Sequence, residues 1–247
     1  MKHRAGSIAA ILAAATIAAA VPAAAGGAKA VIELFTSQAC NSCPPADEIL
    51  GEYAARDDVL ALTLPVDYWD YLGWKDTLAS HDNTVRQKDY AEARGDRQVY
   101  TPQVVVNGVT HVVGSNRQDI EAALRSSAPL PVPITMKAGT DSTTVTVGTP
   151  DLPPGRHKGT IWLAMYGGPV TVPIERGENT GKSVTYYNVV RKLRPIAMWK
   201  GKEVTVELPK SELDQAEVSR CAVILQTENE DGLPGPILGA ATIDYAH

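Results

Sequence analysis

The most informative stretch of this 247-residue chain is Val31-Ile-Glu-Leu-Phe-Thr-Ser-Gln-Ala-Cys40-Asn-Ser-Cys43-Pro44. An apolar run typical of a buried strand leads into two cysteines separated by two residues, and a helix-like run begins at Pro44. A cysteine pair with this spacing, between a strand and a helix, is typical of a redox-active dithiol. The chain contains one further cysteine, Cys221, so the pair belongs neither to a four-cysteine zinc site nor to a disulfide scaffold.

The first 25 residues have the composition of a secretory leader. The basic residues from Lys2 to Arg4 precede an uncharged stretch, Ile8 to Val21, and the small residues Ala23 to Ala25 supply a cleavage site. The apolar stretch has about 14 residues, whereas a helix needs roughly 20 to span a bilayer. We therefore predict a signal peptide over residues 1–25 and a periplasmic or secreted mature protein without a membrane span. A leader retained as an anchor is the alternative.

The charge balance and the remaining motifs argue against several classes of partner. The leader carries Lys2 and Arg4 of the 23 basic residues and none of the 28 acidic ones, so the mature chain has a net charge of about −7. Such acidity disfavours binding to nucleic acid. The run Gly177–Ser183 has too few residues between its glycines for a phosphate loop, so we predict a turn there. The histidines lack paired ligand spacing, and we predict neither a cofactor nor a metal.

The composition changes at Pro129-Leu-Pro-Val-Pro133, where the closely spaced prolines predict a stiff, extended connector. Upstream, over residues 29–128, strand-like and helix-like runs alternate, which predicts an α/β domain with parallel strands. Downstream, over residues 134–247, the runs are β-branched and separated by turn-forming residues. This second pattern predicts an all-β domain, either an antiparallel sandwich or barrel-like.

The α/β pattern continues beyond its first strand–helix–strand unit, Val31–Val66. The stretch Thr84–Arg94 is predicted to be helical. Asn107-Gly108 between two valine-rich runs predicts a hairpin, because this dipeptide supplies the positive φ angles of a type I′ turn. Ser115 is predicted to cap the closing helix of the domain.

Residues 31 to about 126 resemble the thioredoxin superfamily. The resemblance lies in the order of strands and helices, in the Cys-x-x-Cys and in Thr101-Pro102 directly before the hairpin. Several segments are also similar to a secreted bacterial family, a domain of unknown function with a thioredoxin-like N-terminal domain: Phe35–Asp47, Val66–Trp74, Tyr100–Val104, Gly177–Lys182 and Tyr187–Arg191. The resemblance implies a thioredoxin-like domain over residues 29–128 and a cis peptide bond at Pro102 beside the cysteines.

The two cysteines and Pro102 are the predicted catalytic residues. Cys40 lies at the strand-to-helix junction, where unpaired N–H groups and the helix dipole favour a thiolate, so it is predicted to attack the substrate. Cys43 would resolve the mixed disulfide, and Pro102 would shape the substrate groove. Asp47 and Glu48 in the first helical turn oppose a nearby thiolate, so only a modest lowering of the Cys40 pKa is expected.

Other residues are candidates for substrate contact and for proton transfer. The predicted substrate wall consists of Thr101, Asp67, Tyr68 and Trp69. Aromatic faces beside a dithiol suit a peptide or a small ligand; the alternative is that these aromatic residues only pack the insert onto the domain. The resemblance implies that Glu33 relays a proton to the second cysteine, and an ordinary surface carboxylate is the alternative.

We therefore predict an exported thiol-disulfide oxidoreductase that acts on a protein or on small thiols and disulfides. Two alternatives remain open. One is a binding or assembly module in which Cys40–Cys43 is a structural disulfide. The other is a copper-handling protein in which both cysteines and a histidine bind Cu(I), and His111 is the histidine best placed for this. Cys221, in an aliphatic run, is predicted to be a buried, inert thiol.

Overall fold

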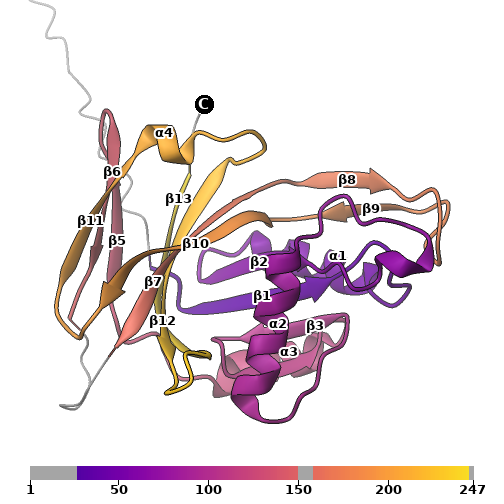
Figure 1. The fold of residues 1–247 in the computed structure, drawn as a ribbon, viewed down its shortest axis with the longest axis horizontal. Helices are drawn as coiled ribbons and strands as arrows, with labels where there is room; N and C mark the ends of the chain where they lie inside the picture. Colours follow the sequence, from indigo (N-terminus) through magenta and orange to yellow (C-terminus); the bar gives the residue numbers. More distant parts are fainter. Residues whose placement is uncertain (1–26, 150–157, 245–247) are drawn as a thin grey trace, which may run out of the picture.

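The computed structural model describes residues 27–149 and 158–244 (Figure 1). The predicted leader, residues 1–25, lies outside the described residues. None of the described helices is both long and apolar enough to cross a membrane. The parts of the chain before and after the proline-rich connector, residues 129–133, contribute strands to one continuous sheet.

The elements before the connector follow the predicted order of strands and helices. They are β1 (Ala30–Thr36), α1 (Pro44–Ala54), β2 (Val59–Pro65), the 3₁₀ helix η1 (Asp70–Leu72), α2 (His81–Arg94), β3 (Gln103–Val106), β4 (Thr110–Val113) and α3 (Arg117–Ser126). β1 and β2 are parallel, and β3 and β4 form the predicted hairpin. Asn107 and Gly108 both have positive φ angles, 49° and 72°, as the type I′ prediction requires.

Two helix starts differ from the sequence prediction. α2 begins at His81 rather than at Thr84, because Ser80 caps it and accepts a hydrogen bond from a first-turn N–H group. α3 is capped by Asn116 and not by Ser115. The Asn116 side chain accepts hydrogen bonds from two backbone N–H groups, and asparagine and serine are similarly good caps, so the residue nearer the free N–H groups takes the position.

The elements after the connector are mostly strands. They are β5 (Ile134–Ala138), β6 (Ser142–Val147), β7 (Gly159–Gly167), β8 (Val170–Pro173), β9 (Ser183–Tyr186), β10 (Val189–Trp199), β11 (Val204–Pro209), α4 (Lys210–Leu213), β12 (Arg220–Glu228) and β13 (Pro234–Asp244). Their turn-rich spacing agrees with the β-rich pattern of the sequence.

The main sheet has eight strands in the order β13-β12-β7-β10-β2-β1-β3-β4. It passes from one half of the chain to the other where β10 pairs in parallel with β2, at Val189 and Thr63. Asn188 strengthens this junction, because its carbonyl accepts a hydrogen bond from the Thr63 N–H (3.0 Å) and its side-chain amide donates to the carbonyl of Ala61 (2.9 Å). The architecture is therefore a mixed α/β fold with a shared sheet.

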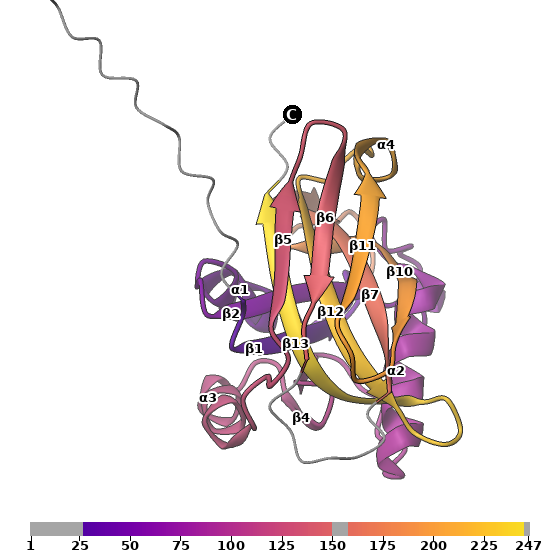
Figure 2. The same ribbon diagram turned by 90° about the vertical axis from the view of Figure 1, so that its left-hand side faces the viewer.

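A second sheet, with the order β11-β6-β5, packs on the C-terminal strands of the main sheet (Figure 2). The core between the two layers includes Val145 of β6, Leu163 of β7, Trp199 of β10 and Val223 of β12, all fully buried. Both sheets are open: the main sheet ends at β13 and β4, and the second sheet ends at β11 and β5. No closed barrel forms among the described residues. The barrel-like alternative is therefore wrong.

The two faces of β1 are covered by different helices. Ile32 and Leu34 point toward α1 and α3, where they pack with Leu50. Val31 and Phe35 point the other way and pack on the side of α2. Because side chains alternate along a strand, Glu33 lies on the same face as Val31 and Phe35. This alternation decides which residues of β1 can approach the dithiol.

β8 and β9 form a separate two-stranded sheet that extends over α1 (Figure 1). We call residues 170–186, which comprise these two strands and the loop 174–182 between them, the arm. Its underside carries a small apolar cluster that includes Ile174 and Tyr186 and packs against Trp74 and Leu78 from the segment after β2. The arm thus brings a late part of the chain to the end of β1.

Candidate functional site

The Cys40–Cys43 disulfide forms at the predicted junction between β1 and α1. The two Cα atoms are 5.4 Å apart, Cys43 is the N-cap of α1 and Pro44 is its first residue. Asn41 and Ser42 are exposed, whereas Cys40 is 3 % exposed and Cys43 is 0 % exposed. The residues between the cysteines therefore reach solvent, while the cysteines themselves are buried.

The start of α1 offers few hydrogen-bond donors to a thiolate. Pro44 and Pro45 have no backbone N–H group. The next two N–H groups, of Ala46 and Asp47, both donate to the carbonyl of Cys43, at 2.8 and 3.1 Å. A thiolate at this helix start would therefore find fewer free donors than at an ordinary one.

Asp47 places a buried carboxyl group next to the dithiol. It lies one helical turn after Cys43, on the same face of α1, and is 2 % exposed. Burial raises the pKa of Asp47 well above its ordinary value; the nearby Thr36 hydroxyl opposes the shift, and the charge of Asp76 adds to it. Neither carboxylate oxygen has a hydrogen-bond partner within the described part of the chain. This group therefore holds its proton more tightly than an exposed aspartate does.

The segment that leads to Cys40 is fixed by residues of the insert after β2. Asp76 accepts a hydrogen bond from the Gln38 N–H (2.8 Å), and Trp74 Nε1 donates to Gln38 Oε1 (2.8 Å). The Gln38 side-chain amide donates to the Thr77 hydroxyl (3.1 Å). Burial raises the pKa of Asp76, and the bonds from backbone N–H groups oppose that shift.

Asn179, in the loop of the arm, closes over the dithiol from the C-terminal half. Its Nδ2 donates to the carbonyl oxygens of Gln38 (2.9 Å) and Cys40 (2.8 Å). Its Oδ1 accepts a hydrogen bond from Lys182 Nζ (2.8 Å). Asn179 is 1 % exposed, so this amide is a buried and well-satisfied contact. We call the two bonds from Asn179 to the carbonyls the Asn179 clamp.

Tyr186, the last residue of β9, is a second buried residue that the arm places near the dithiol. It is 1 % exposed. Burial raises the pKa of Tyr186, and the nearby charges of Asp47 and Asp76 raise it further. The arm, the first turn of α1 and the insert after β2 therefore lie close together beside the disulfide.

The Thr101–Pro102 peptide bond is cis, as predicted. Pro102 is buried and lies beside the first turn of α1, because a Cβ at Gly114 would be 3.2 Å from both Ala46 and Pro102. The structure therefore brings Pro102 and the helix that carries the cysteines into the same neighbourhood.

Residues that were predicted to contact a substrate lie next to this loop together with Tyr71, and we call Thr101, Tyr68, Trp69 and Tyr71 the aromatic wall. Trp69 Nε1 donates to the Thr101 hydroxyl (2.8 Å), and the Trp69 ring stacks on the 78 % exposed Tyr71, with ring centroids 6.5 Å apart. Tyr68 lies against Trp69, and burial raises the pKa of Tyr68 to about 12. Three of the four predicted wall residues therefore lie together.

Asp67, the fourth residue of the predicted substrate wall, instead contacts residues at the start of α2. Its carboxylate accepts a hydrogen bond from the Thr84 hydroxyl (2.5 Å) and lies 2.9 Å from His81 Nδ1. The Thr84 bond is the main cause that lowers the pKa of Asp67, and His81 contributes in the same direction. These contacts tie the start of α2 to the end of β2.

Glu33 lies on the face of β1 that points away from α1 and is buried in an ion pair. Its carboxylate accepts from Arg86 Nε (2.7 Å) and from the Tyr90 hydroxyl (2.5 Å). Arg86 Nη2 also donates to Gln226 Oε1 (2.9 Å), which comes from β12. We call Glu33, Arg86, Tyr90 and Gln226 the Arg86 network; it joins the two halves of the chain on the α2 side of the sheet.

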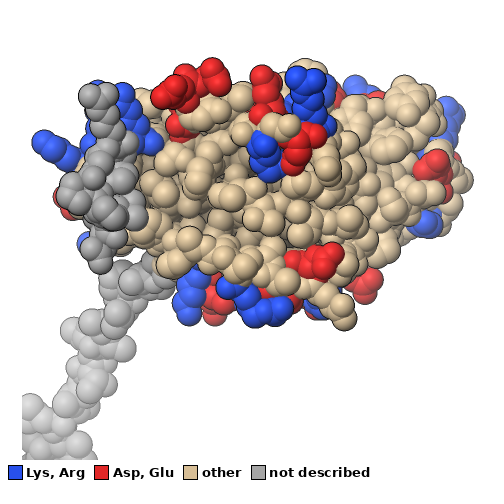
Figure 3. All heavy atoms as spheres, turned by 90° about the horizontal axis from the view of Figure 1, so that it is seen from below, with Lys and Arg blue, Asp and Glu red and all other residues tan. Residues whose placement is uncertain are grey.

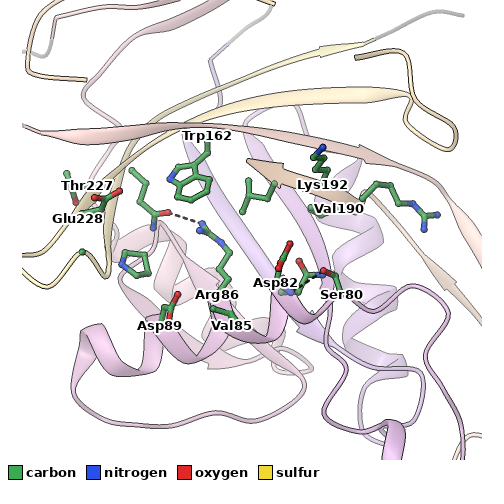
Figure 4. A pocket seen from close by; sticks show the side chains of 16 residues that line it. Ser80, Asp82, Val85, Arg86, Asp89, Trp162, Val190, Lys192, Thr227 and Glu228 are labelled. Atoms are coloured by element: carbon green, nitrogen blue, oxygen red, sulfur yellow. Dashed lines mark hydrogen bonds between the residues drawn. The ribbon is translucent and has the colours of Figure 1, made fainter. Parts of the chain in front are cut away.

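A cavity of about 320 Å³ adjoins the Arg86 network and contains none of the dithiol residues. α2, β7, β10, β12 and the loop after β12 supply its walls. Figure 4 shows Arg86 pointing from α2 toward the ring of Trp162, and the guanidinium carbon lies 5.9 Å from the centre of that ring. The cavity mixes apolar residues with both acidic and basic ones, such as Asp82, Glu228 and Lys192.

His111 and Cys221 lie in separate environments. His111 contacts Asp96 through Nε2 (3.1 Å) and the Tyr100 hydroxyl through Nδ1 (2.9 Å), and burial lowers its pKa. Cys221 is a free, buried thiol on β12, and burial raises its pKa to about 12. Over residues 27–149 and 158–244, no three His, Cys, Asp or Glu side chains gather in a way that could hold a metal ion.

Sequence reasoning missed three residues of this site. Asp76 and Tyr186 gave no signal in the sequence. Asn179 lies in the run that was predicted, correctly, to be a glycine-containing turn between strands, and that run was the signal that could have led to it. The pattern predicts the turn, but not that the turn contacts a segment 139 residues earlier.

Comparison with known proteins gives a family but no activity. A crystal structure of protein AGR_C_4864 from Agrobacterium tumefaciens is 38% identical in sequence, with 90% of this chain and 99% of that chain covered and a TM-score of 0.77. HBP35 of Porphyromonas gingivalis is 10% identical, with 88% of this chain and 75% of that chain covered and a TM-score of 0.63, and is similar in fold alone. No curated protein matches the chain. The model of the family described as "Protein of unknown function (DUF1223)" matches residues 31–226, and the chain therefore belongs to the DUF1223 family.

Proposed function

We propose that this protein is an exported, thioredoxin-like thiol-disulfide oxidoreductase. One arrangement carries the proposal: the Cys40–Cys43 disulfide between β1 and α1, with a buried carboxyl group, Asp47, one turn after Cys43. Pro102 beside the same helical turn and the nearby aromatic wall add a surface for a substrate. Together these features supply a redox-active bond, a proton carrier and a place for a substrate.

The reaction is a reversible exchange of one disulfide. In the oxidising direction a substrate thiolate attacks Cys40 Sγ, the Cys40–Cys43 bond breaks, and Cys43 leaves as a thiolate that takes up a proton. A second substrate thiolate then attacks the substrate sulfur of the mixed disulfide and releases Cys40. The substrate loses two electrons and two protons, and the dithiol gains them. In the reducing direction Cys40 attacks the substrate disulfide and Cys43 resolves it.

Asp47 fits the proton transfer at Cys43 better than Glu33 does. Asp47 follows Cys43 by one turn on the same helix face and has no hydrogen-bond partner among the described residues. The Glu33 carboxylate is instead bonded to Arg86 and Tyr90 on the opposite face of β1. We therefore assign the proton relay to Asp47, which the raised pKa of this group supports.

The substrate is a thiol or disulfide of a protein or peptide, met in the periplasm or outside the cell. The aromatic wall of Trp69 and Tyr71 beside Thr101 supports a peptide substrate. The leader-like sequence supports export. Charge supports a partner other than nucleic acid: on the face shown in Figure 3, basic and acidic side chains are interspersed along the rims and the centre is uncharged.

Turnover of a peptide that carries one disulfide, with dithiothreitol as reductant, tests the proposal on the protein without its leader. The wild type should accelerate the reaction, and Cys40→Ser should lose the acceleration. Cys221→Ala is the matched control, because it removes the buried thiol on β12 and should keep the wild-type rate. Equal rates for the wild type and Cys40→Ser would contradict an oxidoreductase.

Burial of both cysteines favours a second candidate, a binding or assembly module in which the disulfide is structural. An equilibrium redox titration separates the two candidates. A midpoint below about −300 mV indicates a structural bond, and a higher midpoint indicates a pair that exchanges.

A further inference from the structure

The disulfide is buried, and the arm is one of the segments packed beside it, through Asn179 at the Cys40 carbonyl and through β9 on α1. Cys40 and Cys43 are 3 % and 0 % exposed, although they lie at the end of a strand and the start of a helix, where a dithiol would otherwise face solvent. Disulfide exchange requires a thiolate to reach one of the sulfur atoms. A substrate thiol can therefore react only after the covering residues move.

The loop of the arm has the geometry needed to present Asn179 inward. Gly177 and Gly181 lie two residues before and after Asn179, and both have φ angles of +81°, which favour glycine. The Thr180 hydroxyl donates to the Gly177 carbonyl (2.5 Å), and the Gly181 N–H donates to the Ile174 carbonyl (2.8 Å). The turn is thus internally closed and places the amide of Asn179 on the carbonyls of the dithiol segment.

The tip and the base of the arm are held differently. At the base, the Thr63 hydroxyl donates to the Tyr187 carbonyl (2.6 Å), and Gly51 in α1 leaves room for the Tyr187 ring, since a Cβ there would be 2.5 Å from it. The tip is held by the Asn179 clamp and by the apolar cluster around Ile174. β8 and β9 pair with each other and with no other strand of the described chain. A two-stranded sheet by itself is marginally stable, so the arm depends on these contacts and on the packing of β9 against α1.

The clamp also indicates what displaces it. Asn179 donates two N–H bonds to two carbonyls that lie two residues apart in the chain, Gln38 and Cys40. An extended polypeptide offers backbone N–H donors on alternate residues, which match such acceptors, whereas the hydroxyl groups of a small thiol such as dithiothreitol are not held at that spacing. The adjoining wall of Trp69 and Tyr71 supplies a surface for its side chains.

We propose that Asn179 is a positioning residue and that the arm is a gate which an extended polypeptide substrate opens by replacing the two bonds of the Asn179 clamp. This inference rests on the proposed function, because it concerns access to the same disulfide. When the tip lifts about its base at residues 187–189, Cys40 becomes open to the substrate thiolate, and the substrate backbone occupies the carbonyls that Asn179 leaves.

The test compares rates of disulfide reduction in the mature protein, followed by alkylation and mass measurement of the cysteines. Asn179→Asp keeps the shape of the side chain but removes both donors, so dithiothreitol should reduce this variant about tenfold faster than the wild type, or more. A cysteine-containing peptide should gain much less from the same substitution, because it supplies its own donors. Thr171→Val, on the exposed side of the arm, is the matched control and should react like the wild type.

Two further measurements separate gating from a general loss of structure. The urea midpoint of each variant, measured with the disulfide intact, shows whether faster reduction only follows global unfolding, which would overturn the gate. Amide hydrogen exchange should accelerate at Gly181 and Ile174 of the arm in Asn179→Asp and stay unchanged in β1.

The possible failures are distinguishable. If dithiothreitol reduces the wild type and Asn179→Asp at the same rate, the gate is wrong and the oxidoreductase stands. If Asn179→Asp gains as much with the peptide as with dithiothreitol, the polypeptide-opened gate is wrong. If neither protein is reduced short of global unfolding, the disulfide is structural, and the proposed function fails together with the gate.

Discussion

The Arg86 network and the Asn179 clamp both join the two halves of the chain through buried polar groups. In the network, Arg86 contacts Gln226, 140 residues later. In the clamp, Asn179 contacts Cys40, 139 residues earlier. The network contains a buried ion pair, Arg86 with Glu33, whereas the clamp consists of an amide and two backbone carbonyls.

This difference in charge indicates which of the two junctions costs more free energy to break. Breaking a buried ion pair leaves an uncompensated charge, which costs about 3–5 kcal/mol. Releasing a neutral hydrogen bond costs about 1 kcal/mol, because water or a substrate can take the place of the donor. The fold therefore has a fixed junction on the α2 side of the sheet and a releasable one over the disulfide.

Arg86→Met should have the largest effect on stability. It leaves the buried Glu33 carboxylate without its cation, so the free energy of unfolding should fall by about 3–5 kcal/mol in urea titrations with the disulfide intact. The double variant Glu33→Gln with Arg86→Met removes both charges and should recover part of the loss. A loss below about 1 kcal/mol for Arg86→Met would remove the distinction between the two junctions.

Asn179→Ala should cost less, about 1–3 kcal/mol, because it removes two buried hydrogen bonds but leaves no unpaired charge. The same urea titration measures it. Thr185→Val, which removes an exposed hydroxyl from the other strand of the arm, is the control and should change stability little. A loss as large as that of Arg86→Met would mean that the clamp, too, is a permanent junction.

Asp47→Asn should change the pH dependence of stability. The ordinary pKa of this carboxyl is 3.8 and its pKa in the folded protein is raised, so the folded state keeps a proton that the unfolded chain has lost. The stability that this group contributes is therefore complete below pH 3.8 and is lost as the pH rises through the raised pKa. Asp47→Asn should weaken this decline and be more stable than the wild type at neutral pH.

Asp76 acts in the same direction, because burial raises its pKa as well, so part of the decline should remain in Asp47→Asn. Unfolding titrations at several pH values measure the effect. An unchanged slope of stability against pH would show that Asp47 is ionised in the folded protein and would argue against its role as proton relay.

Tyr71→Ala should have the smallest effect on stability, within about 0.5 kcal/mol, because the side chain is 78 % exposed. Exchange with a peptide substrate should nevertheless slow by about two- to tenfold, as one aromatic contact is lost. Exchange with dithiothreitol is the control and should not change. Equal slowing with both thiols would show that Tyr71 does not form part of a substrate wall.

Local patterns were enough to predict the frame of the site. The apolar run before Cys40, the prolines after Cys43 and the Asn107-Gly108 turn each act through their neighbours in the chain, and the structure has the strand, the helix and the hairpin that they predict. The cap of α3 shows the limit of such reasoning, because Ser115 and Asn116 have similar propensities and only the geometry of the free N–H groups chooses between them.

The sequence by itself determined the dithiol, its position between a strand and a helix and the turn that contains Asn179, because spacing and backbone preference specify these features locally. Only the tertiary structure decided that the turn covers the dithiol, that Asp47 is buried beside it and that Glu33 belongs to the Arg86 network. The physical reason is that β10 pairs with β2, which carries a distant part of the chain onto the first strands, and local sequence patterns do not encode a pairing between such distant segments.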